Sequence, residues 1–481
     1  MAHQNKLLIV WGHDPKPKPL LINNTINVDQ GVVFGGKLTA YRYPEREFAA
    51  VKAKQDYSGA DENPLAEWEK NRLNPPNLAK FIQGYSVLTE ELGEVKIFPE
   101  QVKPAIDAVS HFTVSIEQLV YIPPTMSPTP KVSGLADYLE HPKEAIEYYR
   151  SNGIHTMIAE KKHMGSRGIL LLFKDKQASS KHTGIESLGT IYTRTGKRFF
   201  DSETEEQLLV QLNKDLFGMN YFEQYVTDYV LLDAEIMPWN IKAKELISSQ
   251  YAHVAENAMV DRSLLKAKLS AALGTNESLH LWLDEYKQKL ENAHEFNEVF
   301  QKYCWDVDSI NSIQIAPFHV LAHSNKAFID KPHTWHMEMT QFLASESELF
   351  VETEFKIITD EASENDVIKW WQEITGDGHE GLIIKPEFFI AKNKGKLLQP
   401  AIKVRGRKYL RIIYGMDYLE DKNLDRLKNR NTSKKQKMAL KEFALGLEGL
   451  IRYTSGDSIE RVHECSLGTL AMESDPVDPR L

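Results

Sequence analysis

A short charged stretch, AEKKHMGSRG (159–168), stands between two apolar runs and constrains the fold more than any other part of the chain. The apolar letters before it, HTMI, and after it, ILLLF, are typical of two successive strands. Side chains alternate along a strand, so Ile158, Glu160 and Lys162 share one face, and both faces are partly apolar upstream. The pattern therefore predicts a central strand that ends in Lys162, with the carboxylate of Glu160 on the same side.

Two explanations fit Lys162: a surface turn with exposed lysines, or an amine that acts as a nucleophile. An ordinary lysine has a pKa of about 10.4, so deprotonating it at neutral pH costs roughly 4 to 5 kcal/mol. Partial burial and cations such as Arg167 would lower that cost, whereas Glu160 would raise it unless its carboxylate is engaged elsewhere. Gly165 permits a sharp turn and the close approach of a ligand, and Arg167 offers a planar fork for phosphate or ribose oxygens. The spacing K-x-x-G occurs five times in the chain, so the spacing alone leaves both explanations open.

The composition argues against several classes of protein. The 481 residues suffice for about three domains, and 42% hydrophobic residues allow a large core. No run of 18 apolar residues occurs, so we expect no membrane span, and the polar start is not expected to be a secretory signal. With only Cys304 and Cys465, neither a disulfide framework nor a cysteine-based zinc site is expected, which favours a reducing cytoplasm. The net charge of −10 argues against a chain coated by nucleic acid, but a local basic groove is still possible. Candidates for such a groove are the basic segments 403–411 and 428–437. The second segment is equally explained as a solvated helix face.

Strand-rich and helix-rich parts are predicted to alternate along the chain. Residues 1–55 have the alternation and glycine punctuation of strands joined by tight turns, and IPPTMSPTPK (122–131) is typical of an extended linker. Residues 241–303 have helical periodicity and are predicted as a helical insertion, and the tail from Leu424 is predicted to be mostly helical. Further strands are expected at 153–162, 168–173, 229–239, 312–322, 349–358, 380–386 and 401–415. The predicted domains are 1–55, 56–134, 135–415 and 416–481.

Carboxylates and cations recur at the ends of three of these strands. The pairs are Asp233 and Glu235, Glu380 and Lys385, and Lys403 and Arg405. Each pair alone has an ordinary explanation as a strand end. Together with Lys162 they supply what attack on a nucleotide α-phosphate requires: a nucleophile, carboxylates for a divalent metal and the ribose, and cations for the phosphates. Phe318 is a candidate platform for the base, or an ordinary core side chain.

The order of these motifs resembles a known superfamily. E-x-K-x-x-G-x-R, then D-x-E, then E-G-h-h-h-K with apolar h, then K-x-R resembles the covalent nucleotidyltransferases, which include ATP-dependent ligases and mRNA capping enzymes. The longer strings EKKHMGSRG, IYTRTGKRFF, LLDAEIMPW, EGLIIKP, AIKVRGRKYLRIIYG, FALGLEGL and the ending ESDPVDPRL resemble the ligase domain of the bacterial polynucleotide kinase-phosphatase, an RNA repair enzyme. This likeness spans about 135–481. It implies an α+β fold: an ATP-grasp-like DNA/RNA ligase core of antiparallel sheets with a helical insertion and a helical C-terminal module.

The resemblance also implies a role for each site residue. Lys162 would take AMP from ATP as a phosphoramide, and AMP would pass to an RNA 5′-phosphate before a 3′-hydroxyl displaces it. Glu160 and Phe318 would hold the adenine. Arg167 and Glu235 would contact the ribose or the RNA end. Glu380, with Asp233 or Glu235, would help to place Mg²⁺ or Mn²⁺. The phosphates would be bound by Lys385, Lys403 and Arg405.

Two positions depart from the common ligase signature. Met164 stands before the glycine where most ligases have aspartate, and Arg405 replaces the last lysine of K-x-K. Arginine keeps the charge but cannot give up a proton, so Arg405 is expected to act only through electrostatics.

The opening residues VWGHDPKPKPLLINNTINVDQGVVFGGKLTAYRYPERE resemble the last portion of the phosphatase in the same repair enzyme, a two-metal phosphoesterase. His13 matches a metal-ligand histidine, but the earlier metal motifs of such phosphatases are absent, and one histidine cannot hold two metals. We therefore interpret the chain as the ligase subunit of a split enzyme whose N-terminus docks on a kinase-phosphatase subunit, with His13 as a metal ligand only if it completes that site in trans. The alternative is a vestigial cap that packs on its own ligase domain. The resemblance also implies a 3′-terminal RNA methyltransferase as a third member of a hetero-oligomer.

Two other functions remain open from the sequence. A guanylyltransferase or a DNA ligase would use the same lysine chemistry. A non-catalytic assembly subunit could keep the fold and bind only RNA or partners.

Overall fold

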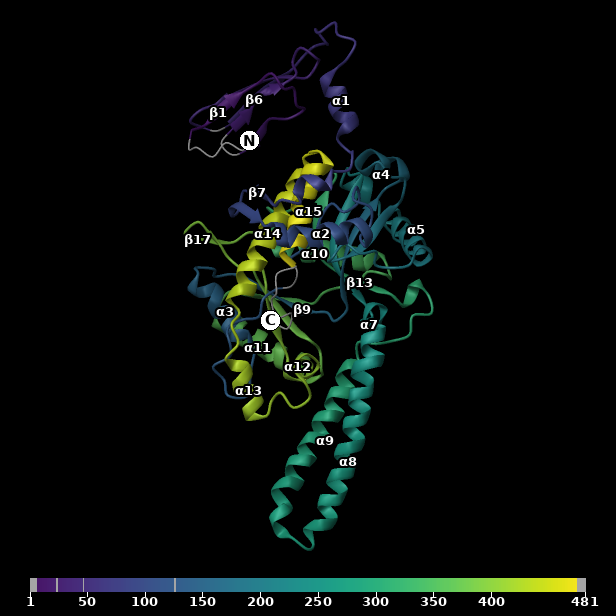
Figure 1. Cartoon of the computed structure of the whole chain (residues 1–481), viewed down its shortest axis with the longest axis vertical. Coiled ribbons are helices and arrows are strands. Elements are labelled where there is room, and N and C mark those ends of the chain that lie inside the picture. Colours follow the sequence, from purple (N-terminus) through teal and green to yellow (C-terminus); the bar gives the residue numbers. More distant parts are fainter. Residues whose placement is uncertain (1–6, 23–24, 46, 125–126, 474–481) are drawn as a thin grey trace.

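Two antiparallel sheets form the centre of the computed structural model, which describes residues 7–22, 25–45, 47–124 and 127–473 (Figure 1). The five-stranded sheet has the order β11-β10-β12-β13-β14 and the four-stranded sheet the order β15-β9-β16-β19. The strands of the first are β10 (Ser166–Phe173), β11 (Gly189–Thr193), β12 (Tyr229–Met237), β13 (Gln314–His323) and β14 (Lys326–Ala327). Those of the second are β9 (Met157–Lys162), β15 (Phe355–Ile358), β16 (Gly381–Pro386) and β19 (Ile402–Arg405). The predicted antiparallel α+β fold is confirmed.

The stretch that opens the sequence argument joins the two sheets. β9 lies between β15 and β16, so the predicted central strand is confirmed. The chain then turns within three residues and enters β10 of the other sheet. β10 pairs with β12, with Arg167 opposite Glu235, and β16 pairs with β9, with Gly381 opposite Lys162. The turn therefore places Lys162 at the end of its strand, next to the point where the chain enters the other sheet.

Helices cover the outer faces of both sheets. The helices around the body are α2 (Pro99–His111), α3 (Pro142–Ser151), α4 (Lys176–Thr183), α5 (Ser202–Gly218), α6 (Tyr221–Gln224), α10 (His333–Glu346), α11 (Glu361–Gly376), α12 (Arg407–Tyr414), α13 (Asp421–Lys428), α14 (Ser433–Thr454) and α15 (Ile459–Glu473). One face of the five-stranded sheet shares a core with α2, α14, α15 and the hairpin of β7 (Tyr85–Thr89) and β8 (Gly93–Ile97). α5, α6 and α10 cover its other face, and α3 and α11 cover the four-stranded sheet.

A helical hairpin projects from the body between β12 and β13 (Figure 1). It consists of α7 (Asn240–Leu246), a π-helical turn (Ile247–Ala252), α8 (His253–Leu273) and α9 (His280–Gln301). The base of the hairpin packs on α12 through Phe296, Phe300 and Tyr409. The helical insertion and the helical C-terminal part are thus present, whereas the domain boundaries stay predictions. No helix among the described residues is long and apolar enough to cross a membrane.

Two segments differ from the sequence prediction. Residues 401–415 form a strand only over β19, because Gly406 begins α12 and the buried Tyr409, Leu410 and Ile412 follow a helical spacing. The predicted linker 122–131 is extended, but its described residues are mostly buried rather than solvent-exposed. Its apolar and proline side chains pack against the body, so this segment forms part of the core.

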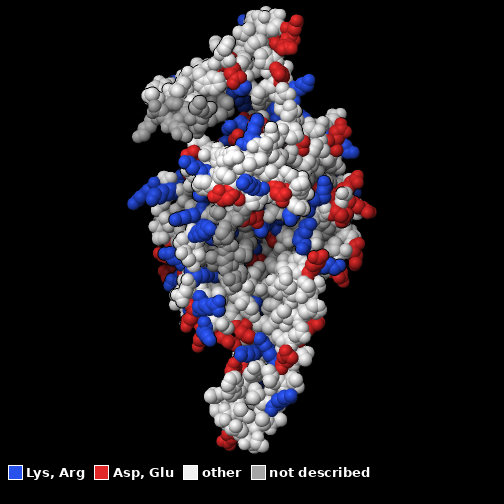
Figure 2. All heavy atoms as spheres, viewed as in Figure 1, with Lys and Arg blue, Asp and Glu red and all other residues white. Residues whose placement is uncertain are grey.

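The described residues between 7 and 57 form a separate module above the body (Figures 1 and 2). One sheet pairs β3 (Thr25–Asn27) with β1 (Ile9–Trp11) and β2 (Leu20–Ile22). The other has the order β4 (Asp29–Gln30), β5 (Lys37–Arg42) and β6 (Glu47–Lys52). α1 (Pro64–Asn71) connects the module to the body. The strands expected here are confirmed.

Glu140 is the centre of a buried ion cluster that fixes the end of β19. Its side chain is inaccessible and accepts from Arg405 Nη2 at 2.6 Å and from Arg430 Nη2 at 3.2 Å. Burial alone would raise the pKa of Glu140, but the two guanidinium groups hold it below its usual value. Replacing Glu140 by alanine is expected to lower the free energy of unfolding by about 3 to 5 kcal/mol, because two buried cations lose their shared partner.

Thermal unfolding followed by circular dichroism measures this loss. Glu354→Ala is the matched control, because its carboxylate is mostly exposed and pairs with Lys161 at 2.7 Å. The control is expected to cost less than about 1 kcal/mol. Equal losses in the two variants would contradict the buried-cluster interpretation.

Candidate active site

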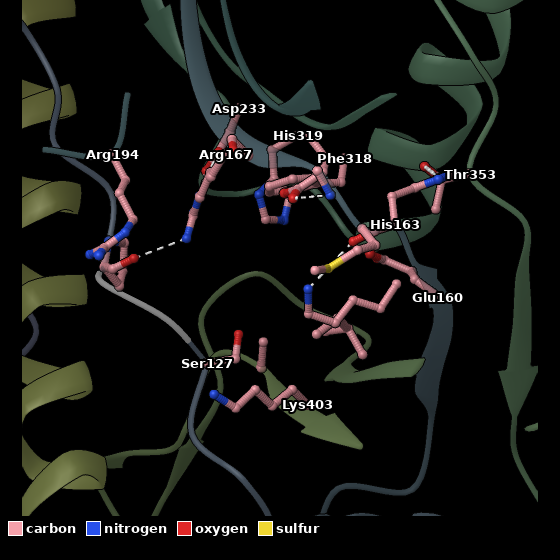
Figure 3. Close-up of a pocket in the computed structure, with 18 of the residues that line it drawn as sticks. Ser127, Glu160, His163, Arg167, Arg194, Asp233, Phe318, His319, Thr353 and Lys403 are labelled. Carbon is pink, nitrogen blue, oxygen red and sulfur yellow. Dashed lines mark hydrogen bonds and ion pairs between the residues drawn. The ribbon is translucent and has the colours of Figure 1, made fainter. Parts of the chain in front are cut away.

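A cavity of about 640 Å³ lies between the two sheets (Figure 3). Its size suits a nucleotide. β9, β16 and β19 line one side, and β10, β12 and β13 line the other. The buried segment 127–128 and α14 close it further. Of the predicted site residues of the ligase core, all except Arg405 line this cavity; they are Glu160, Lys162, Arg167, Asp233, Glu235, Phe318, Glu380, Lys385 and Lys403.

Lys162 reaches the cavity from the end of β9. Its Nζ lies 2.9 Å from Glu380 Oε2, and its side chain keeps 23% of its surface exposed. Burial alone would lower the pKa of Lys162, but the charges of Glu380 and Glu235 outweigh burial and raise it. The amine is therefore protonated in the resting site, and it is neither an exposed turn residue nor a free base.

Gly165 is required because β12 passes close to the turn after Lys162. A Cβ at this position would lie 2.4 Å from the carbonyl oxygen of Ile236. The Gly165 N–H donates to Glu235 Oε1 at 2.9 Å. Close packing of backbone on backbone, rather than the approach of a ligand, thus explains the glycine. The preceding Met164, where most ligases have aspartate, is buried with side chains of the helical hairpin and α12.

Glu235 is a titratable group of the site whose pKa lies near neutrality. Burial, together with the charge of Glu380, raises its pKa to about 7, although Lys162 opposes the shift. A carboxylate in this range can exchange a proton at physiological pH.

Arg167 and Asp233 form a closed pair on the five-stranded sheet. Arg167 Nε donates to Asp233 Oδ1 at 2.8 Å, and Nη2 donates to the other oxygen. Nη1 donates to the Pro124 carbonyl at 2.9 Å. Three of the five N–H donors of this side chain are therefore engaged within the protein. The Arg167 guanidinium also lies 5.4 Å from the centre of the Phe318 ring, which faces the cavity (Figure 3).

Glu160 and Lys385 form a second, nearly inaccessible pair. Glu160 Oε2 accepts from Lys385 Nζ at 2.6 Å, and Lys385 also contacts His319 Nε2 at 3.2 Å. Lys385 thus orients Glu160 instead of reaching freely into the cavity. The other oxygen, Glu160 Oε1, is buried without a hydrogen-bond partner among the described residues. This acceptor is available to a ligand.

The predicted phosphate and metal residues separate into different environments. Lys403 is buried, and its side chain extends toward Ser127 (Figure 3). Arg405 lies outside the cavity lining because Glu140 holds it. The described residues contain no group of three histidine, cysteine or acidic side chains that could hold a metal. Asp233 is neutralised by Arg167, so the carboxylates that remain beside Lys162 are Glu235 and Glu380.

Several residues of the cavity were not predicted. His163 lies beside Lys162 and its Nε2 is 3.0 Å from Thr353 Oγ1. A basic turn after β11 brings Arg194, Lys197 and Arg198 to the lining. The string IYTRTGKRFF contains these cations, and their density was the available signal. His163 and Thr353 gave no signal, because they are 190 residues apart.

A cavity between two antiparallel sheets, with a lysine beside two carboxylates at its floor, is a site of the covalent nucleotidyltransferase class. The family described as "PNKP adenylyltransferase domain, ligase domain" matches residues 104–476. Since this match covers most of the chain, the protein belongs to that family.

Solved structures agree with the fold. A chain of "Structure of Pnkp1/Rnl/Hen1 complex" is 17% identical with a TM-score of 0.55, and the alignment covers 76% of this chain and 98% of that one. A chain of a second structure, "Structure of the Pnkp1/Rnl/Hen1 RNA repair complex", is 18% identical with a TM-score of 0.55. That alignment covers 79% of this chain and 99% of the other.

A different set of relatives matches a short part of the chain. The asymmetrical bis(5′-nucleosyl)-tetraphosphatase of Oceanobacillus iheyensis is 55% identical over 49 residues, which are 10% of this chain and 20% of that protein. The tetraphosphatase of Anoxybacillus flavithermus is 49% identical over 55 residues, which are 11% of this chain and 22% of that protein. The chain thus spans about a fifth of the length of these relatives.

Replacing Glu380 by glutamine is expected to lower the pKa of Lys162, because the nearest anion is lost while burial remains. The free amine fraction at a given pH then rises, and Lys162 should react several-fold faster with an amine-acetylating reagent. Competitive acetylation as a function of pH, read by peptide mass spectrometry, measures the shift. Lys161, whose partner is Glu354, is the internal control and should not change. A midpoint that moves to higher pH would contradict the pairing.

Proposed function

We propose that this chain is an ATP-dependent RNA ligase that works through a lysyl-AMP intermediate on Lys162. The amine attacks the α-phosphorus of ATP, an N–P bond forms, the bond to the β-phosphate oxygen breaks, and pyrophosphate leaves. AMP then moves to an RNA 5′-phosphate, and an RNA 3′-hydroxyl displaces it to form the phosphodiester. The observation that carries this proposal is the position of the Lys162 amine on a nucleotide-sized cavity in a chain of the adenylyltransferase family.

Lys162 must lose a proton before it attacks. Before a metal binds, Glu235 has a pKa near 7 and its charge acts on Lys162, so it is suited to accept that proton at this stage. Glu380 holds the ammonium group until then. The two carboxylates thus fix the amine and prepare it for the reaction.

Glu160 and Phe318 are suited to recognise adenine. Glu160 Oε1 is a buried acceptor without a partner among the described residues, and the 6-amino group of adenine is a donor. Guanine presents a carbonyl oxygen at the same position, so it would leave two acceptors facing each other. Phe318 offers a ring against which a base can stack. This arrangement favours ATP over GTP.

The remaining charges fit the phosphates and a divalent metal. Mg²⁺ is commonly held by one or two carboxylates together with substrate phosphates, and Glu235 and Glu380 would supply that pair. Such an ion would neutralise charge on the triphosphate. Lys403 lines the cavity wall; burial and the charge of Arg405 hold its pKa well below the usual lysine value, and a bound phosphate would favour its charged form. Arg405 contributes only through its field from behind the wall.

The basic turn after β11 is suited to RNA phosphates. Arg194, Lys197 and Arg198 line the same cavity as Lys162, and an RNA phosphate there would compete with Glu473 and Glu205 for the two arginines. We also propose that the chain works in the cytoplasm within a hetero-oligomer with a kinase-phosphatase subunit and a 3′-terminal RNA methyltransferase, in line with the complex named for the structural relatives.

Incubation with α-labelled ATP and Mg²⁺ or Mn²⁺ tests the first step. The protein is expected to become labelled on Lys162, and Lys162→Ala should reduce labelling by at least about 10³-fold because the nucleophile is lost. Lys161→Ala is the matched control and should retain labelling, since this neighbour pairs with Glu354. Label on another residue of the Lys162→Ala protein would identify a different nucleophile.

A panel of nicked and broken ends distinguishes the substrates. RNA ends should be sealed in preference to DNA ends, in a reaction that Lys162→Ala abolishes. Preference for DNA would instead identify a DNA ligase, and labelling by GTP alone a guanylyltransferase. A folded protein that takes no label would support the non-catalytic assembly subunit.

Glu160→Gln is expected to reverse part of the nucleotide preference. If the glutamine carbonyl keeps the bond to Lys385, its amide N–H₂ faces the base and now suits a 6-oxo group. The ratio of labelling by ATP to labelling by GTP should fall by about tenfold or more. Glu354→Gln, on the exposed pair with Lys161, is the control and should leave the ratio unchanged. An unaltered ratio in Glu160→Gln would show that this carboxylate does not read the base.

A further inference from the structure

The N-terminal module, residues 7–57, leaves most of its apolar surface uncovered. Ile26 is the one buried apolar side chain among those that the structure describes in the module. β5 and β6 pair with Leu38 opposite Val51, and these side chains are 64% and 71% exposed. Ala40 and Ala49, one step along the same face, are exposed as well. We call Leu38, Ala40, Ala49 and Val51 the open face.

The described part of the body does not cover the open face, since Leu38 and Val51 stay exposed. None of its described residues belongs to the five clusters of buried apolar side chains in the body. Figure 2 shows few charged side chains on the side of the module in view. A module of about fifty residues, in which Ile26 is the one buried apolar side chain among those described, has too little buried apolar surface to stabilise a fold of its own. The open face is therefore a surface that another body must cover.

The comparisons indicate what that body is. The ligase family accounts for residues 104–476, so the tetraphosphatase likeness fits the phosphatase-like opening residues. In the tetraphosphatases the matched stretch is about a fifth of a longer chain. At 55% identity the two stretches are expected to share their local fold, and the body, which belongs to the ligase family, has no counterpart of the other four fifths of the tetraphosphatase chain.

The loop that carries His13 is built like part of a site. His13 has a φ of 70°, in the left-handed region that costs energy for a residue with a Cβ. Its N–H donates to Asp29 Oδ2 at 3.0 Å, and Asp29 N–H donates to Asn27 Oδ1 at 2.7 Å. The buried Asn27 in turn donates to the Asp14 carbonyl at 2.8 Å. This network fixes the backbone while the imidazole, a common metal ligand, stays exposed.

We propose that the module docks, through the open face, on a second chain that carries the larger part of a metal-dependent phosphoesterase domain, and that His13 completes its active site. In such a site water adds to the phosphorus of a phosphate ester and the P–O bond to the alcohol breaks, which yields phosphate and a free hydroxyl. Removal of a 3′-phosphate would supply the hydroxyl that strand joining consumes. The docking proposal does not depend on the ligase function.

The O. iheyensis tetraphosphatase provides a defined probe. A fragment that lacks the 49 matched residues is mixed with this full chain, and hydrolysis of p-nitrophenyl phosphate with Mn²⁺ is measured. The mixture is expected to exceed the sum of the separate proteins by at least about tenfold. His13→Ala should abolish the gain while the complex persists in gel filtration. Leu38→Glu with Val51→Glu should abolish the complex itself.

A covalent chimera controls for the fragment. In the chimera, residues 7–57 of this chain replace the matched residues of the tetraphosphatase. An inactive chimera would overturn the completion of the site, and an active chimera with an inactive mixture would overturn docking in trans. This chain alone could also form dimers that the double glutamate variant does not form. That result would assign the open face to a second copy of the chain and would overturn the proposal. Labelling of Lys162 by ATP should be unchanged in the His13→Ala and the double glutamate variants of this chain, which separates this test from that of the ligase function.

Discussion

The ion pair between Lys162 and Glu380 is the interaction on which the geometry of the site depends. It joins the end of β9 to the residue before β16, directly beside the backbone pairing of Lys162 with Gly381. Gly165 then brings the turn against β12, so the second sheet is fixed relative to the same amine. The turn and the ion pair thus fix Lys162 relative to both sheets, and its side chain lines the cavity between them.

The cavity balances its charges before any ligand enters. Lys162, Lys385 and Arg167 each have a carboxylate partner on the opposite strand or element, and Arg405 has one behind the wall. Burial of unpaired charges would be costly, so these pairs allow many ionised groups in a small space. A triphosphate that enters competes with the carboxylates for the same cations. A divalent cation bound with it would restore the balance at Glu235 and Glu380, which explains why a polyanion and a metal suit the same site.

Sequence reasoning reached the elements of this site but not its pairings. Alternation along residues 154–162 was enough to predict β9, its central place and the emergence of Lys162, because strand periodicity is a local property. The ion-pair partners are not local, because Glu140 and Arg405 are 265 residues apart in the sequence. No sequence pattern predicts a contact over that separation. For the same reason the sequence predicted that Arg405 binds the phosphates, whereas the structure pairs it with Glu140. It also predicted a linker at residues 122–131, whose described part is mostly buried. The helix after Gly406 was mistaken for a strand because a short apolar run fits both periods.

The shared core of the five-stranded sheet with α14 and α15 has a consequence for the synthesis of the chain. Strand β10 is made early, but the helices that bury one of its faces lie at residues 433–473. During translation this sheet must therefore wait for almost the whole polypeptide before its apolar face is shielded. A ribosome-bound intermediate would leave part of that face exposed while the residues up to α14 are synthesised, and the cavity around the Lys162 amine would be completed only when α14 emerges.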